Sequence, residues 1–170
     1  MWYYKDDVRK SIHRFKFGNA RSYADAYARL LALRLQDRIP SDFDILTWVP
    51  VSRLRRLKRG YDQAELLATA FAKELDMQAT GVLKKIRHTP PQSGLRSAAQ
   101  RRANVLGAYA VHTRQSLTGK RILLLDDVLT TGATASECAR VLMTAGAKEV
   151  YFAAVAVASD DKNNQMQVKL

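Results

Sequence analysis

Two kinds of apolar pattern alternate along the chain. Mainly apolar segments, which predict strands, occupy residues 45–49, 82–86, 105–111, 122–125 and 150–157, and the unbroken apolar run at 122–125 predicts a strand covered on both faces. Apolar residues spaced by three and four positions, which predict helices, occupy residues 20–38, 62–75 and 134–145. Strands that alternate with helices favour parallel pairing with right-handed crossovers. The pattern therefore predicts an α/β fold with a doubly wound, mainly parallel sheet.

The ends of the predicted helices carry the residues that usually mark such ends. Pro40 would stop the first helix. Asp62 and Glu65 have capping-box spacing at the start of the second, with Asp in the place of the usual Ser or Thr. Gly146 stands where the third helix would receive its C-terminal cap. These residues support the helices that the apolar spacing predicts.

Three further segments show no clear period. Residues 1–18 mix aromatic with basic side chains, and we predict a short helix and a lid over the sheet. Residues 87–104 form a long polar loop, and loops of this length are usually functional lids or disordered. The polar tail at residues 160–170 is predicted to be flexible. A length of 170 residues suits one domain, so we expect residues 1–170 to fold as one unit.

The stretch from Ile122 to Thr134 is the most informative part of the chain. Its apolar run ends in two adjacent carboxylates, Asp126 and Asp127, and a hydroxyl-rich loop around Gly132 follows. An unpaired buried charge is costly, so these acids need hydroxyls, a metal or arginines as partners. The helix that follows would offer free backbone N–H groups and about half a positive charge to a phosphate. Gly132 would let the backbone approach a ligand closely, because it has no Cβ.

Three interpretations of this stretch compete. A P-loop ATPase would also end a strand in an acid, but the Gly119-Lys120 pair is followed by Arg121 and lacks the earlier glycine of that motif. In a second interpretation the acids merely cap the helix. The third is a ribose 5-phosphate site, in which vicinal hydroxyls bond to the carboxylates and the phosphate lies in the threonine loop. This last interpretation uses every polar residue of the stretch.

Positive charge is concentrated in two parts of the chain. The net charge is +12, and no Asp or Glu occurs between Met77 and Leu125. A polyanionic small molecule can use part of this charge, and the excess favours a nucleic-acid backbone over a generally solvated basic face. The residues that we assign to such a contact are Arg53, Arg55, Arg56, Lys58, Arg59, Lys84, Lys85, Arg96, Arg101 and Arg102.

Two further features of the sequence, its cysteine content and the length of its apolar runs, indicate the cellular compartment. The single cysteine, Cys138, falls on the apolar face of a predicted helix, so we expect a buried thiol and no disulfide framework. The sequence shows no signal-peptide pattern and no apolar run of about 20 residues, so we expect a cytoplasmic protein without membrane insertion. The sequence assigns no oligomeric state.

Ile122 to Thr134 resembles the thirteen-residue signature of the type I phosphoribosyltransferases at every position. The flanking motifs are similar to those of the ComF family of phosphoribosyltransferase-like competence proteins. These motifs are Val49-Pro50-Val51, Arg59 to Ala64, Thr89, Gln92, Leu95, Arg102 and Asn104. The resemblance runs from about Tyr4 to Val157, and it implies the sheet of that fold with a small hood from the terminal segments.

The resemblance implies phosphoribosyl pyrophosphate as the ligand, with Asp126 and Asp127 on its ribose hydroxyls. The 5-phosphate would lie at Thr130, Thr131, Gly132, Ala133 and Thr134, and the pyrophosphate at Val51, Ser52 and Arg53. Arg87 in the long loop is a candidate partner of the departing pyrophosphate. Mg²⁺ would be carried by the ligand's phosphates, with Asp126 and Asp127 binding it directly or through water.

Two features depart from the family pattern. ComF-like proteins often begin with a four-cysteine zinc ribbon, and this sequence has one cysteine, so we predict no zinc. Either the ribbon lies outside this sequence or this member lacks it. Asp62 stands where the family usually has Asn, which would alter the first turn of that helix but not the fold.

Two functions fit these observations. The first is a competence protein that binds phosphoribosyl pyrophosphate and single-stranded DNA, and acts in DNA uptake for natural transformation beside a ComFA-like helicase. The second is an active phosphoribosyltransferase of nucleotide or base metabolism with an unknown acceptor. A third variant is a regulator that binds the ligand without turning it over.

Overall fold

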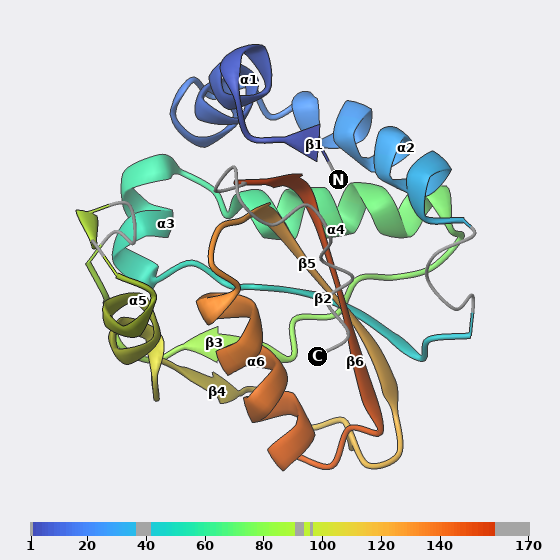
Figure 1. Ribbon diagram of the computed structural model, residues 1–170. Coiled ribbons are helices and arrows are strands. Elements are labelled where there is room, and N and C mark those ends of the chain that lie inside the picture. Colours follow the sequence, from blue (N-terminus) through green and yellow to red (C-terminus); the bar gives the residue numbers. More distant parts are fainter. Residues whose placement is uncertain (1, 37–41, 91–93, 96, 159–170) are drawn as a thin grey trace.

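The computed structural model describes residues 2–36, 42–90, 94–95 and 97–158. Within them the main sheet has four strands, all parallel, in the order β1-β6-β5-β2 (Figure 1). The strands are β1 (Trp2–Tyr3), β2 (Ile45–Trp48), β5 (Arg121–Leu129) and β6 (Glu149–Val157). The prediction of an α/β fold with a mainly parallel sheet is therefore confirmed.

One face of the sheet is covered by the helices α1 (Asp6–Phe17), α2 (Tyr23–Leu35) and α4 (Gln63–Glu74) (Figure 1). Leu123 and Leu125 of β5 are fully buried in the core on this side. Side chains alternate between the faces along a strand, so the odd-numbered residues of this part of β5 point toward these helices.

The opposite face is covered by α6 (Ala133–Thr144) (Figure 1). Ile122 and Leu124, the even-numbered residues of β5, are fully buried in the core on this side together with Cys138. The prediction of a buried thiol at Cys138 is confirmed. A strand covered on both faces explains why residues 122–125 form a continuous apolar run.

Two of the predicted strands do not join the parallel sheet. β3 (Leu83–Lys85) and β4 (Tyr109–Val111) pair antiparallel as a separate two-stranded sheet. The apolar residues at 82–86 and 105–111 thus predicted two strands but not the strands with which they pair. The intervening segment turns the chain back, and Gly107 provides the left-handed backbone before β4 with a φ of +67°. The expectation that both strands lie in the parallel sheet was wrong.

Two helices occur where the sequence predicted loops. α3 (Arg53–Arg59) begins at Ser52, whose side chain accepts from the Arg55 N–H, and ends at Gly60 with a left-handed φ of 79°. α5 (Ala98–Val105) begins with a capping box between Ser97 and Gln100. None of the seven residues of α3, all of them described, is buried, so no apolar period predicted this helix.

The ends of the predicted helices agree with the structure to within a few residues. Asp62 caps α4 by accepting from the N–H groups of Ala64 and Glu65. Gly146 follows α6 with a left-handed φ of +96°. Pro40, Gln92, Arg96 and the tail at residues 160–170 lie outside the described residues. In the part of the chain that the structure describes, every helix is too short or too polar to cross a membrane.

Candidate functional site

The two carboxylates lie inside β5, not beyond its end. β5 continues to Leu129, and it stays paired with β6 as far as Leu129↔Val157. On its other side the pairing with β2 ends at Trp48↔Leu125, where the Val49 N–H still donates to the Leu125 carbonyl at 2.9 Å. The β2 chain then departs, which leaves the edge of β5 at Asp126 and Asp127 open on that side.

The loop after β5 connects directly to the N-terminus of α6. Gly132 caps this helix in a left-handed conformation with a φ of 74°, and its carbonyl accepts from the Ser136 N–H at 2.8 Å. As a glycine, Gly132 has no side chain that could cap this helix end. The first N–H groups of α6 therefore lie at the loop, where they can donate to an anion.

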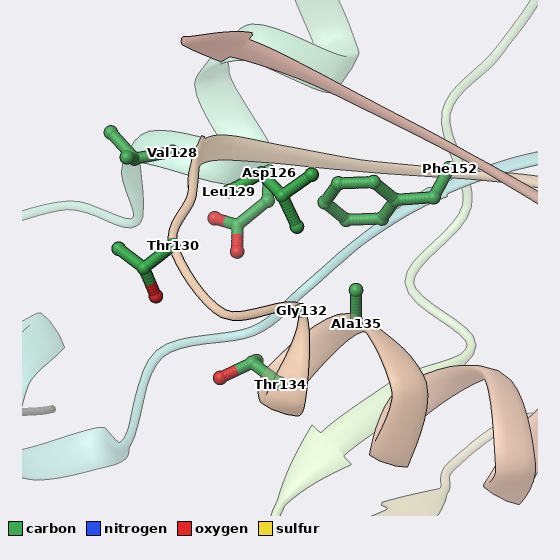
Figure 2. A pocket seen from close by; sticks show the side chains of 8 residues that line it. All are labelled: Asp126, Val128, Leu129, Thr130, Gly132, Thr134, Ala135 and Phe152. Atoms are coloured by element: carbon green, nitrogen blue, oxygen red, sulfur yellow. The ribbon is translucent and has the colours of Figure 1, made fainter. Parts of the chain in front are cut away.

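A small hollow, open to solvent, lies between the end of β5, the loop and α6. Its lining includes Asp126, Thr130, Gly132 and Thr134, with Phe152 of β6 at one side. Figure 2 shows the Asp126 carboxylate pointing from β5 toward the loop that carries Thr130 and turns at Gly132 into α6. Of the predicted phosphate residues, the exposed Thr131 of the loop and the buried Ala133 at the start of α6 are not part of this lining.

Asp126 and Asp127 point to opposite faces of the sheet. Asp126 lines the hollow on the α6 side, and its Oδ1 accepts from the Asp127 N–H at 2.8 Å. Burial raises the pKa of the Asp126 carboxyl well above its ordinary value, and the charge of Asp127 adds to this effect. The site thus contains a carboxylate whose ionisation is disfavoured until a cation or a hydrogen-bond donor reaches it.

Asp127 is paired with a lysine from the N-terminal segment. The Lys16 Nζ lies 2.8 Å from the Asp127 Oδ1, and both side chains are largely buried. Burial alone would lower the pKa of the Lys16 ammonium, but the neighbouring charges of Asp127 and Asp126 outweigh it and raise this pKa. Sequence reasoning missed Lys16, because no motif marks it. The one available sign was its place beside Phe15 on the buried face of a predicted helix.

The predicted pyrophosphate segment follows β2, the neighbour of β5. The Val51 N–H donates to the Asp62 Oδ2 at 2.8 Å, so this N–H is already engaged within the protein. The Ser52 side chain is buried, and its Oγ lies 3.0 Å from the His88 Nδ1. Arg53 is exposed at the start of α3. Asp62 therefore has two structural roles, as the cap of α4 and as the acceptor that anchors this segment. The sequence predicted only the first of them.

Burial is the main reason why the pKa of the Asp62 carboxyl is raised, although three backbone N–H groups oppose this effect. A carboxylate that accepts several N–H bonds in a buried place is held in one orientation. The segment at residues 51–53 is thus tied to the first turn of α4.

The long segment after β3 is tied to α3 and α5 by arginines. Arg55 donates from Nη2 to the Thr89 carbonyl at 2.8 Å. Arg87 donates from Nη2 to the carbonyls of Asn104 and Leu106 at 3.1 and 2.8 Å. The described lining of the hollow does not include Arg87, so its role at the pyrophosphate stays a prediction.

The predicted nucleic-acid residues fall into two groups. Arg53, Arg56 and Lys58 are exposed on α3, as are Leu54 and Leu57. Arg59 lies over the exposed ring of Phe17, with its guanidinium carbon 4.8 Å from the ring centre. The structure thus places basic, apolar and aromatic side chains next to one another around α3 and the end of α1.

The second group lies around β3 and α5. Lys84 and Arg102 are exposed, whereas Arg101 donates from Nε to the Leu95 carbonyl at 3.2 Å. Lys85 is partly buried with its Nζ 5.0 Å from the centre of the Tyr109 ring, and burial followed by the charge of Arg55 lowers its pKa to about 8. Arg55 and Lys85 are therefore less available to a nucleic acid than the exposed residues of α3.

A divalent cation would need ligands besides the protein's own side chains. Within the described residues, no group of three or more His, Cys, Asp or Glu side chains is placed to hold a metal ion. The carboxylate of Asp126 in the hollow is a hard oxygen ligand of the kind that Mg²⁺ prefers, and Mg²⁺ usually keeps waters and phosphate oxygens in its shell. The residues present thus fit a cation that arrives with a phosphorylated ligand.

The chain is similar to proteins of known family. A model of the phosphoribosyl transferase domain matches residues 62–169. Competence protein F of Haemophilus influenzae is 32% identical over 157 residues, which cover 87% of this chain and 67% of that protein. The DNA utilization protein YhgH of Escherichia coli strain K12 is 31% identical over 159 residues, which cover 86% of this chain and 66% of that protein. The chain therefore spans about two thirds of the length of these relatives.

A solved structure has a similar fold. It is the glutamine phosphoribosylpyrophosphate amidotransferase of Bacillus subtilis, complexed with ADP and GMP, with a TM-score of 0.56 and 20% identity. The match covers 84% of this chain and 30% of that one. At this identity the match supports the fold alone.

Proposed function

Because the chain belongs to the ComF family of competence-associated proteins with a phosphoribosyl transferase domain, we propose that it binds phosphoribosyl pyrophosphate at the open edge of β5. The 5-phosphate lies in the loop at residues 130–134, against the N-terminus of α6. The ribose hydroxyls lie at the carboxylate pair, and the pyrophosphate extends toward residues 51–53. Mg²⁺ accompanies the ligand and neutralises part of its charge.

One observation carries this proposal. Asp126 and the N-terminus of α6, which begins at a glycine without a capping side chain, face the same hollow. An acid next to a set of N–H donors suits a ligand that offers hydroxyl donors at one end and an anionic group at the other. A sugar phosphate is such a ligand.

Calorimetric titration with phosphoribosyl pyrophosphate and Mg²⁺ tests the site. The wild-type protein is expected to bind, and the double variant Asp126→Asn with Asp127→Asn is expected to lose at least about tenfold in affinity, or about 1.4 kcal/mol. Asp25→Asn, an exposed acid on α2, is the matched control for the loss of carboxylate charge. Equal affinity of the wild type and the double variant would remove the site from this edge.

We also propose that single-stranded DNA binds around α3 during DNA uptake, in the cytoplasm and beside a helicase-like partner. The exposed residues Arg53, Arg56 and Lys58 and the neighbouring ring of Phe17 support this proposal. Basic side chains that track the backbone and an aromatic ring for base stacking are the usual components of such surfaces.

DNA titrations at several salt concentrations test this surface. Replacing Arg53 and Lys58 together by Gln is expected to reduce the salt slope by about 1.4, since each phosphate contact on a single strand contributes about 0.7. The matched control replaces Lys73 and Lys148, which are exposed elsewhere. The absence of salt-sensitive binding in the wild-type protein would refute the nucleic-acid part.

The alternative is an active phosphoribosyltransferase. The intact carboxylate and threonine motif favours it. Turnover breaks the bond between the ribose C1 and the pyrophosphate oxygen, so release of pyrophosphate with a panel of nucleobases and amines measures it. Binding without acceptor-dependent release would leave the third function, a regulator that binds the ligand without turnover.

A further inference from the structure

The pleat of β5 separates the two adjacent acids. Leu123 and Leu125 pack into the core beside α2 and α4, whereas Leu124 packs into the core beside α6. Asp126 continues the α6 side and lines the hollow, and Asp127 continues the other side and meets Lys16. The two carboxylates therefore have different neighbours, although they are adjacent in the sequence.

Lys16 is held firmly where it meets Asp127. Ile12 and Phe15 of α1 are fully buried, and the Tyr61 hydroxyl donates to the Phe15 carbonyl. The Lys16 side chain is 21% exposed, and the Asp127 side chain is 11% exposed. α1 is thus anchored by core residues directly before the contact, which holds Lys16 in place beside Asp127.

The ion pair also changes the charge that a ligand meets. Two uncompensated carboxylates at the edge of β5 would repel a phosphorylated ligand, and a buried charge without a partner is costly. The Lys16 ammonium compensates one of them at a distance of 2.8 Å. The hollow is then left with one acid, Asp126, beside the N–H groups of α6.

We propose that Lys16 is a positioning residue of the sugar-phosphate site. It holds Asp127 on the α1 side of β5 and compensates its charge, so that Asp126 is the carboxylate that contacts the ribose hydroxyls. This inference rests on the proposed binding of phosphoribosyl pyrophosphate. It gives the N-terminal segment a role in binding that no motif of the sequence assigns, and it assigns different roles to two acids for which the motif predicts the same contact.

The inference predicts how affinity depends on Mg²⁺. Without Lys16, the charge of Asp127 must be neutralised by a cation from solution. Lys16→Met is therefore expected to weaken binding of phosphoribosyl pyrophosphate about tenfold at low Mg²⁺ and much less at high Mg²⁺. Lys16→Arg keeps the charge and is expected to bind within about threefold of the wild type. Arg14→Met removes an exposed charge from the same helix and is the matched control.

Calorimetric titrations with phosphoribosyl pyrophosphate across a series of Mg²⁺ concentrations measure these affinities, and thermal unfolding shows that each variant is folded. A double variant, Lys16→Met with Asp127→Asn, covers the case in which the single variant does not fold. It lacks the uncompensated charge, so it is expected to regain most of the affinity and the weak Mg²⁺ dependence of the wild type.

Three outcomes would overturn the inference. If the wild type does not bind the ligand, the proposed function fails and this inference fails with it. If the wild type and Lys16→Met bind equally with the same Mg²⁺ dependence, only the inference fails. If the double variant binds the ligand as weakly as a single Asp126→Asn variant does, Asp127 itself contacts the ligand. The assignment of different roles to the two acids is then wrong.

Discussion

The loop at residues 130–134 and the segment at residues 51–53 follow neighbouring parallel strands, yet they are held in different ways. The first is fixed by the main chain: β5 stays paired with β6 up to Leu129, Gly132 turns the backbone and α6 begins at once. The second is fixed by side chains, through bonds of Asp62 to the Val51 N–H and of His88 to Ser52. The loop at residues 130–134, the proposed phosphate loop, is therefore held by the fold itself, whereas the segment at residues 51–53, the proposed pyrophosphate segment, depends on contacts that single substitutions remove.

The largest effect is expected from Gly132→Val. A β-branched residue at a φ of +74° is strained by about 1–2 kcal/mol, and relief of that strain would turn the first N–H groups of α6 away from the hollow. We expect a loss of affinity for phosphoribosyl pyrophosphate on the order of 100-fold, measured by calorimetry.

Gly119→Val is the control for this substitution, because Gly119 has a φ of +72° and open space around it at the opposite end of β5. It should lose similar stability and keep its affinity. Equal loss of affinity in both variants would mean that strain anywhere in the fold is enough, and the main-chain account of the phosphate loop would be wrong.

A smaller effect is expected from Asp62→Ala, which removes the acceptor for the Val51 N–H and the cap of α4. A buried N–H without a partner costs about 1–3 kcal/mol, and the loosened segment should bind the ligand about tenfold more weakly. Asp62→Asn keeps one acceptor oxygen and should lie between the two. Urea unfolding and calorimetry measure both quantities; a destabilised Asp62→Ala protein with unchanged affinity would separate this segment from the ligand.

Arg55→Met tests the contact between α3 and the segment after β3. Loss of the bond to the Thr89 carbonyl should cost about 1 kcal/mol or less, because a hydrogen bond of this kind is worth about that much. We expect faster amide hydrogen exchange in residues 87–89 and little change elsewhere. Lys58→Met, an exposed position of the same helix, should leave these amides protected.

The smallest effect is expected on the pH dependence of the protein's stability, to which the buried carboxyl of Asp126 contributes. Burial and the charge of Asp127 raise the pKa of Asp126 in the folded protein, so its contribution to stability is largest at low pH and is lost as the pH rises through that raised pKa. Asp126→Asn should therefore raise the melting temperature at pH 8 but not at pH 3.5, by about 2–4 °C for each kcal/mol gained. An equal shift at both pH values would contradict this account.

The comparison also explains what could be predicted from the sequence. The strand at 122–125, the glycine of the loop and the helix that follows were predicted because their pattern is local. α3 was not, since none of its described residues is buried and its contacts are made with Glu65, Thr89 and Gln63, of which Thr89 is distant in the sequence. Pattern alone likewise gave the strands β3 and β4 but not their antiparallel pairing.

Lys16 illustrates a further limit of the sequence. Its contact with Asp127 joins segments from opposite ends of the described chain, and neither segment carries a sign of the other. Residues 1–18 show no clear period in the sequence, and the burial of Ile12 and Phe15 of α1 depends on how the whole fold is assembled. A motif indicates the chemistry of its own residues, but which distant residues contact them depends on the fold.

The pairing of β1 with β6 has a consequence for the order of assembly during synthesis. Trp2 and Tyr3 pair with Ala156 and Val157, so β1 finds its neighbour only after β6 has been made. Such a long-range contact forms late, because a large loop of chain must close first. α1 follows β1 directly, so its docking is expected to be among the last steps. A nascent chain is then expected to form the turn at Gly132 and the start of α6 before Lys16 reaches Asp127.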